Sequence, residues 1–198
     1  MQPKDPSDPG RRKFLIASTS VVGTVGVAGA AIPFLSALKP SAKAQAAGAP
    51  TKVDISNLEK GEMMLVEWRG LPIYIIRHNT ESLKALKQNI SRLLDPDSKE
   101  DQQPEYARNE NRSRREDIVV LEAVCTHLSC APKFYPELGS NEFDDNWQGG
   151  FFCPCHGSKF DLAGRVYSGV PAPTNMPVPP HYYESENILV IGEEGELT

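Results

Sequence analysis

Two short boxes of cysteine and histidine carry the residue types in this sequence that are best suited to metal and redox chemistry. They run from Cys125 to Cys130 (CTHLSC) and from Cys153 to Ser158 (CPCHGS). Together they hold all four cysteines and two of the four histidines of the 198-residue chain. Each box offers one Cys-His pair and one additional cysteine. That arithmetic indicates four ligands for a metal centre plus one disulfide.

Two thiolates and two imidazoles suit either a zinc ion or a two-iron cluster with cysteines on one iron and histidines on the other. Zinc sites usually pair their ligands as C-x-x-C or H-x3-5-H. Here the pairs are C-x-H (Cys125 and His127) and C-x-x-H (Cys153 and His156). A zinc ion would also give no role to the remaining cysteine of each box. The spacing therefore favours an iron–sulfur centre and electron transfer, with a structural zinc module that binds a partner as the alternative.

The two boxes resemble those of Rieske iron–sulfur proteins, in particular the kind found in quinol–cytochrome c reductases. The resemblance continues in Trp68-Arg69-Gly70 and in the N-terminus. It also includes residues Gly169 to Asn175 (GVPAPTN), which are similar to the proline loop that covers the cluster in this family. Rieske modules of ring-hydroxylating oxygenases share the ligand pattern but usually lack the two additional cysteines. The resemblance covers most of the chain and implies a Rieske [2Fe-2S] cluster as the cofactor.

The resemblance also implies a role for individual residues of the two boxes. Four side chains would hold the cluster, cysteines on one iron and histidines on the other: Cys125 and Cys153, then His127 and His156. The remaining two cysteines, Cys130 and Cys155, would form a disulfide that ties the loops together. Ser158 would donate a hydrogen bond to a cluster sulfur. His156 would accept a hydrogen bond and the proton from a bound quinol, and Leu128 would help to dock the tip at the quinol site.

Neutral imidazole ligands explain why such a cluster suits quinol oxidation. They make the cluster less negative than four thiolates do, which raises its reduction potential into the range of about −150 to +300 mV. Reduction of the cluster also raises the pKa of a bound imidazole, since the neighbouring positive charge decreases. Electron uptake and proton uptake are thereby coupled at one residue.

Two positions depart from the family pattern. Phe160 stands where the family often has a tyrosine that donates a hydrogen bond to a ligand sulfur, so we expect a somewhat lower potential. Ser129 stands where glycine is common. If the backbone needs a positive φ there, serine adopts it at some cost.

The N-terminal region predicts an exported and anchored protein. Residues 14–38 form an uncharged stretch of 25 residues, about 37 Å as a helix, which is enough to cross a hydrocarbon core of about 30 Å. Arg11 and Arg12 precede it and resemble a twin-arginine export signal. Basic residues are more frequent before the stretch than after it, which predicts a cytoplasmic N-terminus and a periplasmic head. A disulfide persists in that compartment. The alternative is a cleaved signal peptide, with Ala42-Lys43-Ala44 as its cleavage site.

The expected organisation has four parts. Residues 1–13 are a cytoplasmic N-terminus with the twin-arginine motif, and residues 14–38 are a single-pass anchor in the bacterial inner membrane. Residues 39–50, rich in alanine and with few bulky residues, are a flexible hinge linker, or alternatively an inert spacer. Residues 51–198 are a periplasmic Rieske domain, with a cluster-binding subdomain at about 118–175.

The head is expected to be mainly β, an antiparallel β-sandwich with a small cluster-binding subdomain and one helix. Met63–Trp68 and Pro72–Arg77 predict a β-hairpin. Ile118–Ala123 and Ile188–Ile191 predict further strands. Thr80–Leu94 predicts the helix, because its leucines and isoleucine fall on one face and a proline follows.

Two segments of the head have no regular pattern. Asp95–Asp117 is polar and highly charged, so we expect a surface loop. Ala131–Gly150 contains prolines, glycines and aspartates and predicts an irregular excursion, either in contact with a neighbouring subunit or a tolerated surface insertion. His78 and His181 lie far from a second ligand in the sequence, and we expect no redox role for either.

Charge and resemblance together define the expected partners. Residues 40–198 contain 16 basic and 24 acidic residues, which argues against nucleic acid. The resemblance implies a subunit of a ubiquinol–cytochrome c reductase, active only within a dimeric complex. Its partners would be ubiquinol, a cytochrome b subunit, a c-type haem subunit and membrane lipid. The alternative is the small subunit of an arsenite oxidase-like molybdoenzyme, which needs no quinol contact.

Overall fold

The computed structural model describes residues 9–38, 41 and 48–195. The chain divides into two compact units, Met1–Ala46 and Ala47–Thr198, and each is described by itself. The predicted cleavage site at Ala42-Lys43-Ala44, the first eight residues of the predicted N-terminal part and most of the predicted hinge lie outside the described residues. The domain boundaries proposed above therefore stay predictions.

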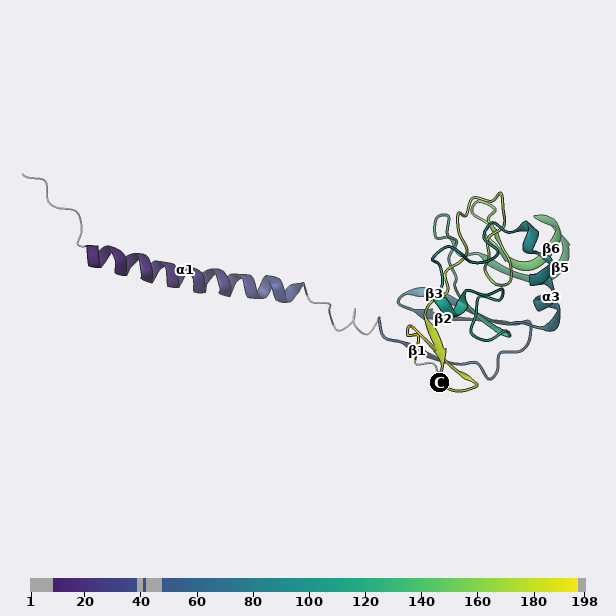
Figure 1. Ribbon diagram of the computed structural model, residues 1–198, viewed down its shortest axis with the longest axis horizontal. Coiled ribbons are helices and arrows are strands. Elements are labelled where there is room, and N and C mark those ends of the chain that lie inside the picture. Colours follow the sequence, from purple (N-terminus) through teal and green to yellow (C-terminus); the bar gives the residue numbers. More distant parts are fainter. Residues whose placement is uncertain (1–8, 39–40, 42–47, 196–198) are drawn as a thin grey trace, which may run out of the picture. The chain divides into compact units, whose positions relative to one another are not determined.

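The first unit contains one long helix, α1 (Pro9–Ala37), drawn in purple in Figure 1. It has a mean hydropathy of 1.8 and is, within the described part of the chain, the one helix long and apolar enough to cross a membrane. The hydroxyl of Thr19 donates to the carbonyl of Leu15 at 2.7 Å, and that of Thr24 to Ser20 at 2.8 Å. These bonds satisfy the hydroxyls within the helix, as an apolar environment requires. The helix starts earlier than the predicted residue 14 and includes Arg11 and Arg12 in its first turns.

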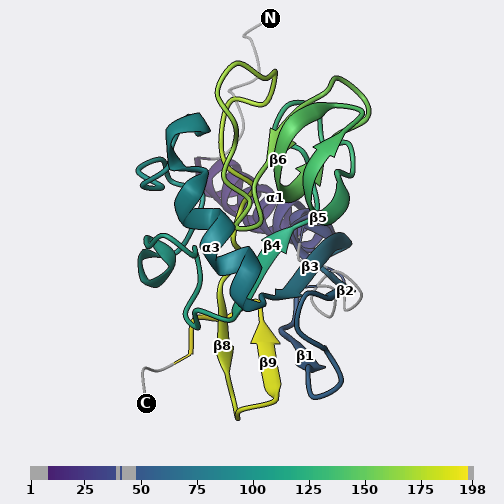
Figure 2. The ribbon, with the colours of Figure 1, turned by 90° about the vertical axis from the view of Figure 1, so that its right-hand side faces the viewer.

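The second unit, the head, is mainly β. Its strands form three antiparallel sheets of three strands each among the described residues. The first sheet joins β1 (Thr51–Asp54), β9 (Ile188–Ile191) and β8 (His181–Tyr183). The second joins β2 (Met63–Trp68), β3 (Leu71–Arg77) and β4 (Ile118–Glu122). The third joins β5 (Lys133–Asn141), β6 (Asp144–Phe152) and β7 (Lys159–Phe160). In Figure 2 the β8-β9-β1 sheet lies at one end of the head and the β5-β6 hairpin towards the other.

The β2-β3 hairpin has the form that the sequence predicts. Trp68 pairs with Leu71, which leaves Arg69 and Gly70 as a two-residue turn. Both turn residues have positive φ, 55° and 75°. This is the conformation that matches the twist of a tight hairpin. Its central strand β3 pairs on the other side with β4, which leads directly into the first box.

The predicted helix is present but shorter than expected. α3 (Thr80–Gln88) begins at a capping box, in which Asn79 accepts from the Ser82 backbone and Ser82 accepts from the Asn79 backbone. A 3-10 turn, η1 (Ile90–Arg92), follows. Leu93 then forms an isolated β-bridge with Tyr167 instead of a further helical turn. The end of the helix is set by this tertiary pairing, which the local periodicity does not contain.

The prediction of an irregular excursion at 131–150 is wrong, because this segment forms the long β5-β6 hairpin. Two of the residues that suggested a loop, Pro136 and Gly139, lie at irregularities of the pairing. The register shifts between Tyr135 and Leu138, around Pro136, and again between Gly139 and Asn141. Trp147 is fully buried and donates from Nε1 to the Tyr135 carbonyl at 2.9 Å. Bulges thus absorb the strand-breaking residues while aromatic packing holds the two strands together.

The prediction of a polar surface loop at 95–117 holds for most of its charged side chains, which are exposed, but not for the whole segment. The segment contains little regular structure, with one 3-10 turn, η2 (Glu105–Ala107). It nevertheless buries polar side chains in the head: Ser98, Gln103, Arg112 and Ser113. Arg112 is the one charged side chain of this segment that is buried.

Candidate metal centre

The first box is a tight loop at the end of β4. The Cys125 N–H donates to the Cys130 carbonyl at 2.7 Å, and the Ser129 N–H donates back to the Cys125 carbonyl at 2.9 Å. Ser129 has a φ of 61°. The expectation that this position needs a positive φ is confirmed. The loop leaves Leu128 at its tip with 66% of its surface exposed.

The second box repeats this geometry after β6. The Cys153 N–H donates to the Ser158 carbonyl at 2.8 Å, and the Gly157 N–H donates to the Cys153 carbonyl at 2.9 Å. Gly157 has a φ of 77°. In each loop the cysteine N–H bonds the carbonyl five residues on, and the fourth residue after the cysteine has a left-handed backbone. Two similar loops are thereby presented from two different sheets.

A disulfide joins the two loops, between Cys130 and Cys155, whose Cα atoms are 6.7 Å apart. The pairing implied by the family resemblance is confirmed. The Sγ atom of Cys153 lies within 4.8 Å of both disulfide sulfurs. These three sulfurs do not make a ligand set, because a disulfide sulfur has no thiolate to offer a metal.

The other two cysteines, Cys125 and Cys153, are free buried thiols, 2% and 1% exposed. Burial raises the pKa of the Cys153 thiol, and the adjacent Cys125 side chain raises it further. Backbone N–H groups of Cys155 and His156 act in the opposite direction. A metal centre replaces the thiol protons of such a pair, and the two N–H groups then remain as donors to a ligand sulfur.

The two box histidines lie beside each other. The ring centroids of His127 and His156 are 4.8 Å apart, and the ring planes meet at 87°. His156 is exposed and His127 is half-buried. The Nδ1 atom of His127 is buried and has no hydrogen-bond partner among the described residues. A buried nitrogen without a partner costs free energy unless a ligand or metal completes it. The donor set thus fits a centre with two sulfur and two nitrogen ligands.

The proline loop, residues 169–175, is hydrogen-bonded to both boxes. Ser158 is fully buried, and its Oγ atom accepts from the Ala172 N–H at 3.0 Å. That bond leaves the serine hydroxyl proton available to another acceptor. Thr126, which lies between two box ligands, donates from its hydroxyl to the Thr174 carbonyl at 2.7 Å. Thr126 was not predicted as a site residue, although its position between Cys125 and His127 in the sequence is a signal for it.

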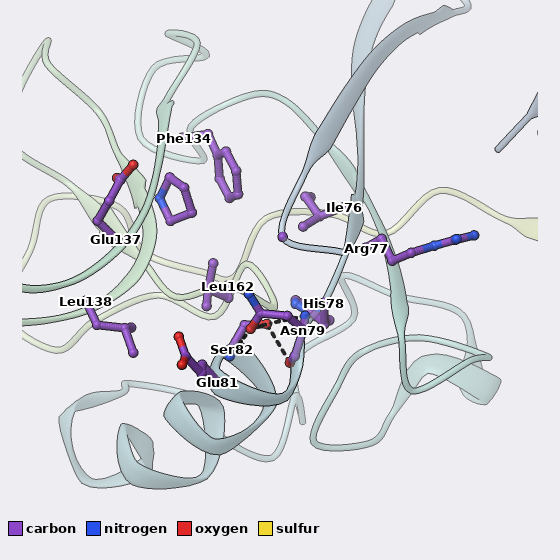
Figure 3. Close-up of a pocket in the computed structure, with 12 residues that line it drawn as sticks. Ile76, Arg77, His78, Asn79, Glu81, Ser82, Phe134, Glu137, Leu138 and Leu162 are labelled. Carbon is purple, nitrogen blue, oxygen red and sulfur yellow. Dashed lines mark hydrogen bonds between the residues drawn. The ribbon is translucent and has the colours of Figure 1, made fainter. Parts of the chain in front are cut away.

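The remaining two histidines lie in the interior. His78 and His181 are 2% and 0% exposed, and burial lowers the pKa of each to about 4. His181 is 3.3 Å from the Tyr106 hydroxyl through Nδ1. Figure 3 shows His78 at the edge of a cavity of about 260 Å³ between α3 and β5, with Phe134 and Leu162 also in its wall. Among the described residues, those that line this cavity include none from the two boxes.

Comparison with known proteins identifies the family. Residues 106–180 match the family described as the Rieske [2Fe-2S] domain, and residues 1–41 match the twin-arginine signal of ubiquinol–cytochrome c reductase iron–sulfur subunits. The chain is 48% identical over 184 residues to the ubiquinol–cytochrome c reductase iron–sulfur subunit of Allochromatium vinosum, covering 93% of this chain and 89% of that protein. It is 41% identical over 194 residues to the subunit of the same name from Blastochloris viridis, covering 97% and 98%.

A solved structure shows the same fold. A chain of a hyperthermophilic respiratory Complex III superposes with a TM-score of 0.50 and 24% sequence identity, covering 88% of this chain and 99% of that one. The two similar loops, the disulfide and these relatives agree, and they favour the quinol enzyme over an arsenite oxidase-like enzyme or a zinc module. The chain belongs to the family of Rieske iron–sulfur subunits of ubiquinol–cytochrome c reductase, and its cofactor is a [2Fe-2S] cluster.

Proposed function

We propose that Cys125 and Cys153 bind one iron of the cluster and that His127 and His156 bind the other. The main observation behind this proposal is that the two boxes contain two buried free thiols and two adjacent imidazoles. One imidazole, that of His127, has a buried nitrogen without a hydrogen-bond partner among the described residues. When bound, the cluster supplies a one-electron acceptor at a potential suited to quinol. The Ser158 hydroxyl, whose oxygen accepts from the Ala172 N–H, would be able to donate to a cluster sulfur and so stabilise added negative charge.

His156 is the ligand that contacts the quinol in this proposal. Its side chain is exposed, whereas His127 is half-buried. An exposed imidazole accepts a hydrogen bond from a quinol hydroxyl and then holds its proton. Leu128, exposed in the first box and adjacent to His127 in sequence, would help to cover the contact and exclude water. The subunit thus takes an electron and a proton from ubiquinol and delivers the electron to a c-type haem subunit.

The N-terminal unit is proposed to hold the head at its partners. We infer that α1 spans the bacterial inner membrane once, with the N-terminus cytoplasmic and the head periplasmic, since Arg11, Arg12 and Lys13 lie at its N-terminal end. The partners are a cytochrome b subunit, a c-type haem subunit, ubiquinol and lipid within a dimeric complex, outside which the subunit does not turn over. Co-purification of b- and c-type haem proteins from detergent extracts supports this assignment, and a molybdenum protein in their place contradicts it.

The decisive experiment compares two histidine variants of the full chain in its complex. For His156→Ala we expect loss of the Rieske electron paramagnetic resonance signal and of quinol–cytochrome c turnover. His78→Asn, outside both boxes, is the matched control and should keep both. A variant at position 156 that retains the signal and the turnover would overturn the proposal.

A further inference from the structure

The proline loop is closed at its base by its own neighbours. The Met176 N–H donates to the Gly164 carbonyl at 2.8 Å. The Val166 N–H donates to the Asn175 side-chain oxygen at 2.9 Å. Asn175 is itself buried, at 1% exposed. These two bonds bring the chain before and after residues 169–175 together, so the loop projects from a defined base towards the boxes.

A second segment brackets this base. We call residues 92–112 the strap. Four hydrogen bonds join it to residues on both sides of the proline loop: Leu94 N to Val166 O (2.9 Å), Ser168 N to Arg92 O (2.8 Å), Asn175 Nδ2 to Asp95 O (3.1 Å) and Val178 N to Gln102 O (2.8 Å). The strap therefore contacts the chain that enters the loop and the chain that leaves it.

Arg112 ends the strap inside the protein. Its guanidinium is fully buried and donates from Nη1 to the Ala163 carbonyl at 3.1 Å and from Nη2 to the Gln103 side chain at 3.0 Å. Burial lowers its pKa to about 10, so it stays cationic at neutral pH. Both terminal nitrogens of the guanidinium therefore have partners, whereas Nε is buried without one among the described residues. A buried cation depends on such hydrogen bonds, so moving Arg112 away from the base of the loop costs free energy.

The base of the proline loop is closely packed around Gly164, next to this arginine. A Cβ atom on Gly164 would lie 2.9 Å from the Leu121 side chain and 3.2 Å from Arg112 Nη1. Leu121 belongs to β4, the strand that leads to the first box. The base of the proline loop is thus packed between the strap and that strand.

We propose that the strap positions the proline loop on the two boxes and that Arg112 is a positioning residue for the cluster. The contacts continue from Arg112 through the loop base to Ala172, whose N–H fixes the Ser158 hydroxyl, and to Thr174, which Thr126 holds. A hydroxyl that accepts one hydrogen bond is oriented and becomes a better donor for the next. The inference rests on the ligand set proposed above, because the Ser158 hydroxyl can change a reduction potential only if a cluster lies between the two boxes.

The test replaces two arginines of the same stretch by methionine in the full chain within its complex. Arg112→Met removes the contacts at the loop base and leaves Asp161 paired with Arg165, 2.7 Å apart. Arg115→Met is the matched control, since Arg115 also donates to a side chain, Asp117, and to a backbone carbonyl, that of Glu186. Asp117 immediately precedes β4 and Glu186 lies between β8 and β9, so neither partner belongs to the proline loop.

Two measurements separate positioning from mere stability. We expect Arg112→Met to lower the midpoint potential of the cluster in a titration followed by electron paramagnetic resonance. We also expect hydrogen exchange of the peptide covering residues 166–176 to be at least tenfold faster. Arg115→Met should change neither. An unchanged potential and unchanged exchange in Arg112→Met would overturn the inference.

A milder variant covers the case in which Arg112→Met does not assemble. Gln103→Leu removes one partner of the guanidinium and keeps the arginine, so we expect the same two changes to a smaller degree, and their absence contradicts the inference. Absence of the Rieske signal from the wild-type chain would contradict the proposed ligand set. A normal wild-type signal, with unchanged potential and unchanged hydrogen exchange in the variants, would contradict only the role of the strap.

Discussion

Ser129 and Gly157 occupy equivalent places in the two boxes, with φ angles of 61° and 77°. Each donates its N–H to the carbonyl of the cysteine that opens its loop. One loop uses the residue suited to this conformation, and the other uses a residue that adopts it with strain. The first box therefore stores backbone strain beside a proposed iron ligand, and the second does not.

Exchanging these residues should change stability in opposite directions. We expect Ser129→Gly to raise the free energy of unfolding by about 0.5 kcal/mol, because glycine relieves the strain but adds freedom to the unfolded chain. Gly157→Ala should lower it by about 1 kcal/mol. At Gly157 an added Cβ would meet no described atom within 4 Å, so the cost is one of backbone conformation. Urea unfolding of the full chain in detergent measures both, and equal effects at the two positions would contradict this account.

Phe160 offers a way to raise the cluster potential. It is fully buried and packs in the same apolar cluster as Cys125 and Cys153. A tyrosine hydroxyl at this place would donate to a ligand sulfur and stabilise the reduced state. A bond worth about 1 kcal/mol corresponds to about 40 mV for a one-electron couple, and we expect Phe160→Tyr to raise the midpoint potential by this order. Redox titration beside the wild type measures it, and an unchanged potential removes the claim.

Leu128 should affect docking without affecting the cluster. Truncation of an apolar anchor at the centre of an interface costs about 1–2 kcal/mol, or roughly a tenfold loss of affinity. We therefore expect Leu128→Ala to lower quinol–cytochrome c turnover while the midpoint potential stays unchanged. Leu65→Ala is the matched control, because Leu65 is 60% exposed on β2. Equal loss of turnover in both variants would mean that Leu128 has no special contact.

The two interior histidines should make the head sensitive to acid. Burial lowers the pKa of His78 and of His181 to about 4, whereas an unfolded histidine titrates near about 6.5. Between these values the unfolded chain binds protons that the folded chain does not, so stability is complete above pH 6.5 and is lost as the pH falls towards 4. At pH 5 each histidine should cost about 2 kcal/mol.

The measurement is the denaturant midpoint of the full chain at pH 7 and at pH 5. His181→Gln cannot take up a proton in the unfolded state, so its stability should fall less steeply than that of the wild type. A variant with the same pH dependence as the wild type would show that His181 does not carry this effect.

Much of the protein was determined by local sequence. Box composition and spacing favoured an iron–sulfur centre, and the family resemblance that the boxes carry implied the [2Fe-2S] cluster. The uncharged stretch that follows Arg11 and Arg12 predicted the long apolar helix. Two short apolar runs, Met63–Trp68 and Pro72–Arg77, predicted the β2-β3 hairpin. These features depend on residue type and short spacing, so the tertiary structure had little to add to them.

Long-range contacts decided the rest. Residues 131–150 have the composition of a loop, yet they form most of the β5-β6 hairpin. Bulges accommodate the residues with low strand propensity, and burial of Trp147 stabilises the pairing. Leu93, predicted to be helical, instead forms a β-bridge with Tyr167. Arg112, which the local sequence marks as a surface charge, is buried because the Ala163 carbonyl and the Gln103 side chain accept hydrogen bonds from its guanidinium. Burial and hydrogen-bond satisfaction depend on residues far along the chain, which no local pattern of residue types records.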